Sequence, residues 1–228
     1  MYWGYDSTYI LLIIGVIISA MASARLNSVY GKYRKVRSAS GMTGAQAAQR
    51  ILRAAGISDV SIGMVNGSLS DHYDPRTKRV NLSREIYEGT SLASVGVAAH
   101  ECGHAIQHAT NYAPLSFRST IVPLANLGSQ LSWPLFLAGL IFSIEPLLTV
   151  GILLFSLAVL FQLVTLPVEF NASSRALRML DDTGILGNQE IKGAKAVLKA
   201  AALTYVAALL SSILQLLRLV ALSRRRER

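Results

Sequence analysis

The sequence is poor in charged residues and contains a single cysteine. Charged residues make up 15% of the 228 positions, whereas a soluble domain carries about a quarter. Because Cys102 is the only cysteine, an intrachain disulfide is excluded, and nothing indicates an oxidising compartment. The sequence has neither an internal repeat nor a low-complexity linker. The charge deficit is concentrated in a few long apolar stretches, which indicates membrane spans rather than a soluble core.

The charge that is present is mostly positive, with a formal net charge of +9. Such a balance can indicate nucleic acid, anionic lipid, or loops on the cytoplasmic side of a membrane. The basic residues cluster beside apolar segments, so lipid and membrane topology explain them first. No motif or interleaved aromatic patch supports nucleic-acid binding, and we expect none.

The first apolar run, from Tyr9 to Ala24, predicts an N-terminal membrane anchor at residues 1–24. A cleaved signal peptide is the alternative, but the preceding MYWGYDS has no positive charge. Basic residues follow the run instead, starting at Arg25. We therefore expect the N-terminus outside and the following loop in the cytoplasm.

Two more apolar runs, Ile121 to Ile144 and Leu147 to Val168, predict a transmembrane helical hairpin at residues 119–168. A turn as short as the one between them cannot cross a membrane, so the hairpin returns to the side from which it started. A last apolar run, Val197 to Leu222, predicts either a fourth span or a long packed helix. Residues 169–228 would then hold a helix that follows the hairpin from Glu169 onward and this apolar helix.

The polar and mixed segment at residues 25–118 is the predicted catalytic domain. Its patterns indicate, in order, a helix over Gly44–Ala55, a strand over Val60–Val65, a strand hairpin over Ser70–Ser83 and a helix capped by Thr90 or Ser91. The fold class is thus mainly α, a membrane protein with three to four transmembrane helices and a small α+β domain.

The last of these helices contains His100-Glu101-Cys102-Gly103-His104, the HExxH pattern. Two histidines four positions apart lie on one helix face, so both imidazoles can reach one metal ion. Zinc prefers such nitrogen ligands, and Glu101 is placed to accept a proton from a water at the metal. Two histidines on an ordinary core helix are the competing interpretation. The pattern nevertheless predicts zinc ligands at His100 and His104 and a catalytic base at Glu101.

A third protein ligand is needed, and helix geometry excludes the nearest histidine. His108 would lie about 12 Å along the axis from His100, which is too far for shared coordination. The metzincin pattern would need a histidine where Thr110 stands and a glycine where Gln107 stands. We therefore expect His108 to pack or to support a ligand, and Cys102 to be a small buried residue.

Among the acidic residues downstream, Glu169 is the predicted third ligand. It follows Pro167, where the predicted hairpin returns to the side of the motif. Asp181 and Asp182 are expected to be surface acids at a helix end, about 18 Å further along. An interfacial carboxylate at the end of a span is the competing interpretation of Glu169.

Three segments together, HECGHAIQHA, DHYDPRTKRVNLS and LPVEFNASSRAL, resemble the YugP-like neutral zinc metallopeptidases, a group of bacterial membrane proteases. The resemblance covers nearly the whole chain. A more distant one, to the gluzincin-type CAAX-prenyl and heat-shock membrane peptidases, implies a glutamate that opens an E-x-x-A-D sequence. Glu169 and Ala172 match it, but Ser173 replaces the aspartate. Ser173 lies on the same helix face as Glu169 and could hydrogen-bond a ligand histidine. The resemblance implies a zincin-like catalytic domain.

We therefore hypothesise a membrane-embedded zinc endopeptidase that acts on a peptide or protein, which could itself be a membrane protein. It would lie in the bacterial plasma membrane with its active site on the cytoplasmic side. A zinc-bearing scaffold or chaperone-like subunit without activity is the main alternative, and a hydrolase of other bonds is a third. We also expect Arg79 to Ser83 to be an edge strand that pairs with substrate. His72 and Tyr73 are candidates for stabilising the oxyanion, and packing or turn hydrogen bonds are the competing interpretation of each.

Overall fold

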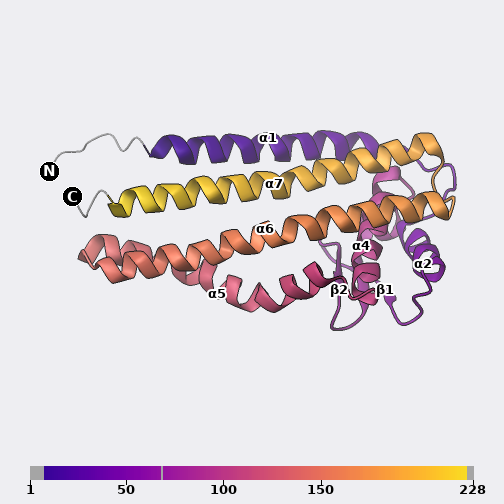
Figure 1. Ribbon diagram of the computed structural model, residues 1–228. Coiled ribbons are helices and arrows are strands. Elements are labelled where there is room, and N and C mark those ends of the chain that lie inside the picture. The colour runs from indigo at the N-terminus through magenta and orange to yellow at the C-terminus, as the bar shows by residue number, and fades with distance from the viewer. Residues whose placement is uncertain (1–7, 68, 225–228) are drawn as a thin grey trace. The chain divides into compact units, whose positions relative to one another are not determined.

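A computed structural model describes residues 8–67 and 69–224 of the chain (Figure 1). The elements in chain order are α1 (Tyr9–Tyr33), α2 (Gly44–Ala54), β1 (Ser61–Val65), β2 (His72–Asp74), β3 (Arg79–Ser83), α3 (Arg84–Glu88), α4 (Leu92–Ala109), α5 (Ala113–Phe142), α6 (Glu145–Asp182) and α7 (Asn188–Arg224). The predicted fold class is confirmed: the protein is mainly helical, with one small sheet.

The chain divides into two compact units. The helical unit comprises the described parts of Met1–Ser23, Phe117–Leu166 and Thr204–Arg228, and the α+β unit comprises Ala24–Ser116 and Pro167–Leu203. Within the described residues, four helices (α1, α5, α6 and α7) are long and apolar enough to cross a membrane.

In the helical unit, α5 and α6 pack as a hairpin through glycines. A Cβ atom on Gly128 would lie 2.8 Å from the carbonyl oxygen of Leu154, and one on Gly151 would lie 2.9 Å from the backbone nitrogen of Phe136. Small residues let helix backbones approach this closely in membranes. The chain reverses at Ser143, which has a φ of 59°. Glu145 therefore belongs to the first turn of α6, not to the turn between the helices.

The outer surface of the helical unit is apolar. Exposed side chains include Ile13 (51%), Leu127 (52%), Ile141 (73%) and Leu153 (61%). A soluble monomer rarely exposes an apolar surface of this extent, whereas a lipid-facing one requires it. Helices α1 and α7 are joined in this unit by a hydrogen bond of 2.9 Å between the hydroxyls of Ser19 and Ser211.

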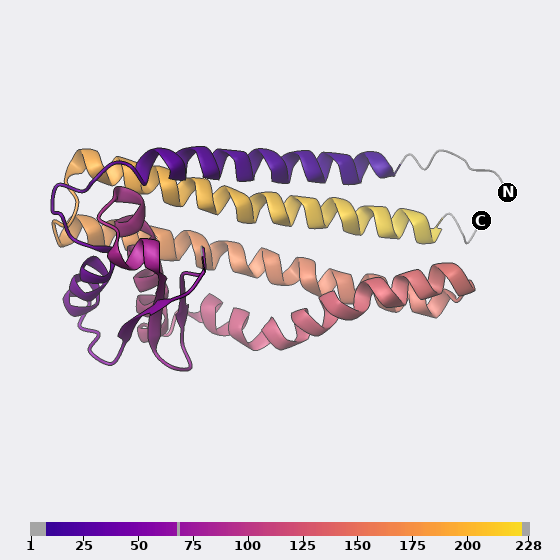
Figure 2. The ribbon, with the colours of Figure 1, turned by 180° about the vertical axis from the view of Figure 1, so that it is seen from behind.

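In the α+β unit, the sheet has the strand order β1-β3-β2. β1 pairs parallel with β3, and β2 pairs antiparallel with it (Figure 2). The predicted strand and hairpin are confirmed, but the prediction that Arg79 to Ser83 is an edge strand is wrong. β3 lies in the centre because β2 pairs with one of its edges and β1, which precedes the hairpin in sequence, pairs with the other. Its backbone groups are therefore used on both edges, and it cannot pair with a substrate.

Helices α2 and α4 cover one face of this sheet. Val80 and Leu82 are fully buried and point toward these helices, whereas Arg79 points to the opposite face. Thr43 and Gln46 form a capping box that begins α2. The hydroxyl of Ser91 accepts a hydrogen bond from the backbone of Ser94 and begins α4. The sheet and α2 thereby hold α4, which carries the HExxH pattern, from behind.

Candidate metal centre

Helix α4 presents His100 and His104 on one face, and α6 presents Glu169 to both. Nε2 of His100 lies 3.2 Å from Oε2 of Glu169, and Nε2 of His104 lies 3.6 Å from the same oxygen. The potential ligand atoms of the three residues all lie within 4.8 Å of one another. The three predicted ligands, separated widely in sequence, are thus brought together and could hold a metal ion.

The cluster lies inside the α+β unit, because α6 continues as a helix past Pro167 to Asp182. Glu169 is 3% exposed and His104 is 9% exposed. A buried carboxylate needs a positive partner, and two imidazoles or a metal ion between them would supply it. Asp181 and Asp182 are exposed at the end of α6, as predicted.

Gly103 lets α6 approach α4 at this position. A Cβ atom on Gly103 would clash with the carbonyl oxygen of Ala172 and lie 3.0 Å from its carbonyl carbon. Ala172 is fully buried and follows Glu169 by less than one helical turn. The glycine inside the HExxH pattern therefore brings the third residue of the cluster within reach of the two histidines.

The imidazole of His104 is oriented by Gln107, a residue that the sequence alone did not single out. The amide nitrogen of Gln107 donates to the carbonyl oxygen of Val168 at 2.8 Å and to Oδ1 of Asn171 at 3.0 Å. The amide oxygen is thus left to accept from Nδ1–H of His104, at 3.0 Å. With its proton on Nδ1, His104 presents the lone pair of Nε2 to the cluster.

The imidazole of His100 is oriented by Ser173, as predicted from its position one turn after Glu169. The Ser173 hydroxyl lies 3.1 Å from Nδ1 of His100. The hydroxyl oxygen can accept a hydrogen bond from Nδ1–H, and in that tautomer Nε2 of His100 offers its lone pair as a ligand. Both histidines therefore have a partner on the ring nitrogen that faces away from Glu169.

The charges around His104 favour a proton on it in the absence of a metal ion. Burial acts to lower the pKa of His104, but the hydrogen bond to Glu169 and the negative charges of Glu101 and Glu169 raise it above its ordinary value. Glu101 is itself buried, with 7% exposure. A cation at this position would replace the proton, since a metal ligand must be deprotonated.

The other residues considered from the sequence lie away from the cluster. Cys102 is fully buried against α2, and burial raises the pKa of its thiol above the usual range. Nδ1 of His108 lies 2.7 Å from the hydroxyl of Tyr73, so His108 packs against β2, while burial raises the pKa of Tyr73 to about 12. His72 pairs with Asn81 on the sheet face opposite α4. His72 therefore points away from the motif helix.

A helix-borne HExxH pattern joined by a distant glutamate, in a chain with apolar helices long enough to span a membrane, is typical of membrane metallopeptidases. The profile of one such family, described as "Putative neutral zinc metallopeptidase", matches residues 8–224. The chain belongs to this family.

The chain is also similar to "Putative membrane protease YugP" of Bacillus subtilis (strain 168). It is 47% identical over 213 residues, which cover 93% of this chain and 95% of the relative. The resemblance inferred from the three sequence segments is thereby confirmed. No solved structure matches the chain.

The orientation of His104 can be tested by substitution of Gln107. We expect Gln107→Leu to weaken zinc binding by about 10–100-fold, because Nδ1 of His104 loses its acceptor. Gln107→Glu, which keeps an acceptor oxygen, should bind zinc more tightly than Gln107→Leu. Competition with a fluorescent zinc chelator measures both. Equal affinities in the two variants would show that Gln107 has no orienting role.

Proposed function

We propose that this protein is a membrane-embedded zinc endopeptidase. His100, His104 and Glu169 would hold the zinc ion, and Glu101 would act as the general base. The observation that supports this most directly is the convergence of the three side chains from α4 and α6 to within 4.8 Å. Membership of a zinc metallopeptidase family supports the same conclusion.

The residues present suit zinc. Two imidazole nitrogens and one carboxylate oxygen are a common catalytic zinc ligand set, which leaves a coordination position for water or substrate. Gln107 and Ser173 contact the Nδ1 atoms of the two histidines and can both accept from Nδ1–H, which supports the tautomer that metal binding through Nε2 requires. When bound, zinc would supply a Lewis acid for the scissile carbonyl and the attacking water.

The chain itself would supply the proton transfers. Glu101 is buried beside His100, where its carboxylate would take a proton from the attacking water. The same carboxyl group would then deliver the proton to the amine of the leaving peptide. Gln107 and Ser173 would keep the imidazoles fixed during this sequence. An extended peptide or protein segment is the proposed substrate.

A catalytically inactive zinc-binding scaffold is the alternative. It would retain His100, His104 and Glu169 but would have no use for a buried carboxylate at Glu101. A structural zinc site also takes four protein ligands, as a rule, whereas the cluster here offers three. Both observations favour the peptidase.

Hydrolysis of casein by the purified full chain tests the proposal. We expect cleavage in detergent micelles, its loss with 1,10-phenanthroline, and its recovery when zinc is added back. Casein cleavage that continues unchanged in the chelator would contradict a zinc mechanism. Zinc binding without hydrolysis of casein or a membrane-protein panel would favour the scaffold.

We further propose that the protein lies in the plasma membrane with the metal centre on the cytoplasmic side. The apolar surface of the helical unit would contact lipid. Arg25, Lys32 and Arg34 follow the first apolar run closely, and basic residues near a first span are retained in the cytoplasm. Nucleic acid is not among the proposed partners.

Cysteine labelling tests this sidedness in a Cys102→Ser background. Ala54→Cys is exposed on α2, and we expect a membrane-impermeant maleimide to miss it in intact cells but to label it after permeabilisation. Ile144→Cys lies between α5 and α6 and is 43% exposed. It should react in intact cells. Labelling of Ala54→Cys but not Ile144→Cys in intact cells would show that the topology is the reverse of the proposed one.

A further inference from the structure

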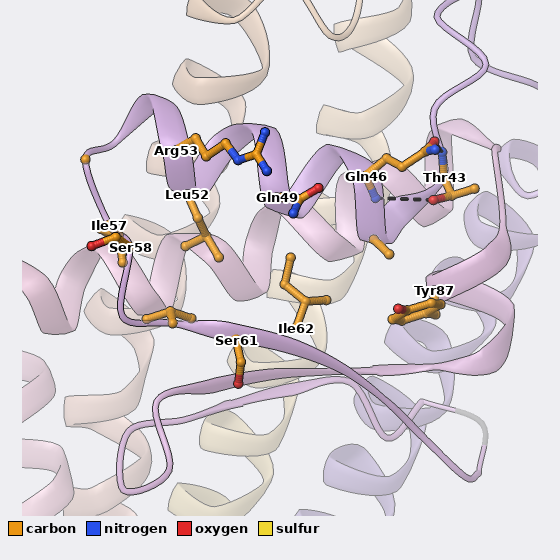
Figure 3. Close-up of a pocket in the computed structure, with 13 residues that line it drawn as sticks. Thr43, Gln46, Gln49, Leu52, Arg53, Ile57, Ser58, Ser61, Ile62 and Tyr87 are labelled. Carbon is orange, nitrogen blue, oxygen red and sulfur yellow. Dashed lines mark hydrogen bonds between the residues drawn. The ribbon is translucent and has the colours of Figure 1, made fainter.

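A groove with a volume of about 830 Å³ lies in the α+β unit, between α2 and β1 (Figure 3). We call it the α2–β1 groove. Leu52 of α2, Ile57 and Ile62 form its apolar interior, and the ring of Tyr87 lies at one end. Ile62 points from β1 toward α2, whereas Ser61 points away. The groove thus runs along the strand and has room for the side chains on one face of an extended peptide.

Strand β1 has a free edge along this groove. Within the described residues, β1 pairs with β3 alone and ends the sheet. Ser61 donates its backbone N–H to Lys78 on the β3 side. In a parallel pair the alternate residues bond to the partner, so the backbone groups of Ile62 and Met64 point to the open edge. These groups can bind one further extended strand.

The polar rim of the groove is positive. Among the described residues that line it, Arg53 carries the one formal charge, and Gln46 and Gln49 lie along the same helix. Asp59, which is near but outside the lining, forms an ion pair with Lys78. An acidic side chain in the groove would therefore meet an attractive charge at Arg53, and a basic one a repulsive charge.

The groove is separate from the metal centre. Cys102 of α4 points away from the cluster and contacts the carbonyl oxygen of Ala48 in α2 at 3.7 Å. Helix α2 therefore packs behind the HExxH face, and its other side lines the groove. A ligand in the groove would not contact His100, His104 or Glu169.

We propose that the α2–β1 groove binds an extended peptide segment that adds to the free edge of β1. Alternate side chains of this segment, apolar and acidic, enter the space between β1 and α2. The backbone of Ile62 and Met64 supplies the pairing, and Arg53 selects the acidic side chain. This binding site is distinct from the proposed catalytic site and does not depend on peptide hydrolysis.

Fluorescence anisotropy with a defined probe tests the proposal. The probe is a fluorescein-labelled nine-residue peptide with serine at odd positions and valine, leucine, glutamate and valine at even positions. The full chain in nanodiscs carries Glu101→Gln to prevent cleavage. We expect saturable binding, about tenfold weaker when lysine replaces the glutamate. A peptide with alternate amides N-methylated on the pairing edge should lose binding, because it cannot donate to the strand.

Two pairs of protein variants locate the site. Met64→Pro removes an N–H that faces the open edge and leaves the bonds to β3 in place, so it should lose the probe, whereas Met64→Val should keep it. Arg53→Glu should prefer the lysine peptide, and Arg53→Lys should keep the preference for glutamate. The Arg53 pair leaves the strand untouched, so it decides the outcome even if Met64→Pro unfolds.

Three results would overturn the proposal. The first is the absence of saturable binding, and the second is equal binding of the N-methylated peptide. The third is a glutamate preference that survives Arg53→Glu. If Met64→Pro instead converts a dimer to a monomer by light scattering and no peptide binds, a second copy of the chain occupies this edge and the proposal is wrong.

Discussion

Glu101→Gln should greatly slow peptide hydrolysis while zinc binding is kept. The carboxamide has nearly the shape of the carboxylate but cannot accept a proton from water. General-base catalysis contributes about 10²–10⁴-fold, so we expect the rate of casein cleavage to fall by that factor. The residues proposed to hold the zinc are unchanged, and zinc content by elemental analysis should stay at the wild-type level.

Glu88→Gln is the matched control for this prediction. Glu88 is an exposed carboxylate at the end of α3 and forms an ion pair with Arg84 on the surface. It should keep both activity and zinc. Near-normal turnover in Glu101→Gln would show that another group takes the proton, and loss of zinc in this variant would show that Glu101 has a role in binding the metal.

Glu169→Ala should lose zinc. The substitution removes the carboxylate that lies 3.2 Å and 3.6 Å from the two imidazoles and leaves them with a cavity. Loss of a residue that only orients a ligand lowers metal affinity by about 10–100-fold, and we expect a larger fall in zinc affinity here. Hydrolysis should fall with it. Competition with a fluorescent zinc chelator gives the affinity directly.

Asp181→Ala and Asp182→Ala are controls from the same helix. Both side chains are exposed at the end of α6, and neither belongs to the cluster. Their zinc affinity should equal that of the wild type. Unchanged affinity in Glu169→Ala would exclude it as a ligand and leave the third zinc ligand to be found elsewhere.

Local patterns were sufficient to predict most elements of the α+β unit. Ser91, one of the two predicted capping residues, begins α4, and the helix predicted over Gly44–Ala55 forms at Gly44–Ala54. The predicted turn joins β2 to β3. Each of these features depends on neighbours in sequence. The E-x-x-A-D comparison and the position of Ser173 one turn after Glu169 predicted a hydrogen bond to a ligand histidine, and His100 is that histidine. The interactions involved reach over a few residues, and periodicity alone reveals them.

Features that depend on contacts between segments distant in sequence could not be predicted from local patterns. The central position of β3 follows from where β1 returns, which strand propensity does not encode. Gln107 orients His104 only because Val168 and Asn171 of α6 lie beside it. Its position three residues after His104, on the same helix face, was the one signal in the sequence. Likewise, nothing in the sequence indicated that Gly103 is needed for the close packing of α4 against the backbone of Ala172.

The separation of the cluster into two distant segments also affects the order of events during synthesis. His100 and His104 leave the ribosome about 65 residues before Glu169, or on the order of 3–13 s at ~5–20 residues per second. Helix α5 and most of α6 are made in that interval. A nascent or truncated chain that ends before Glu169 therefore cannot complete the three-residue cluster, so any chemistry that needs all three residues must wait until α5 and most of α6 exist.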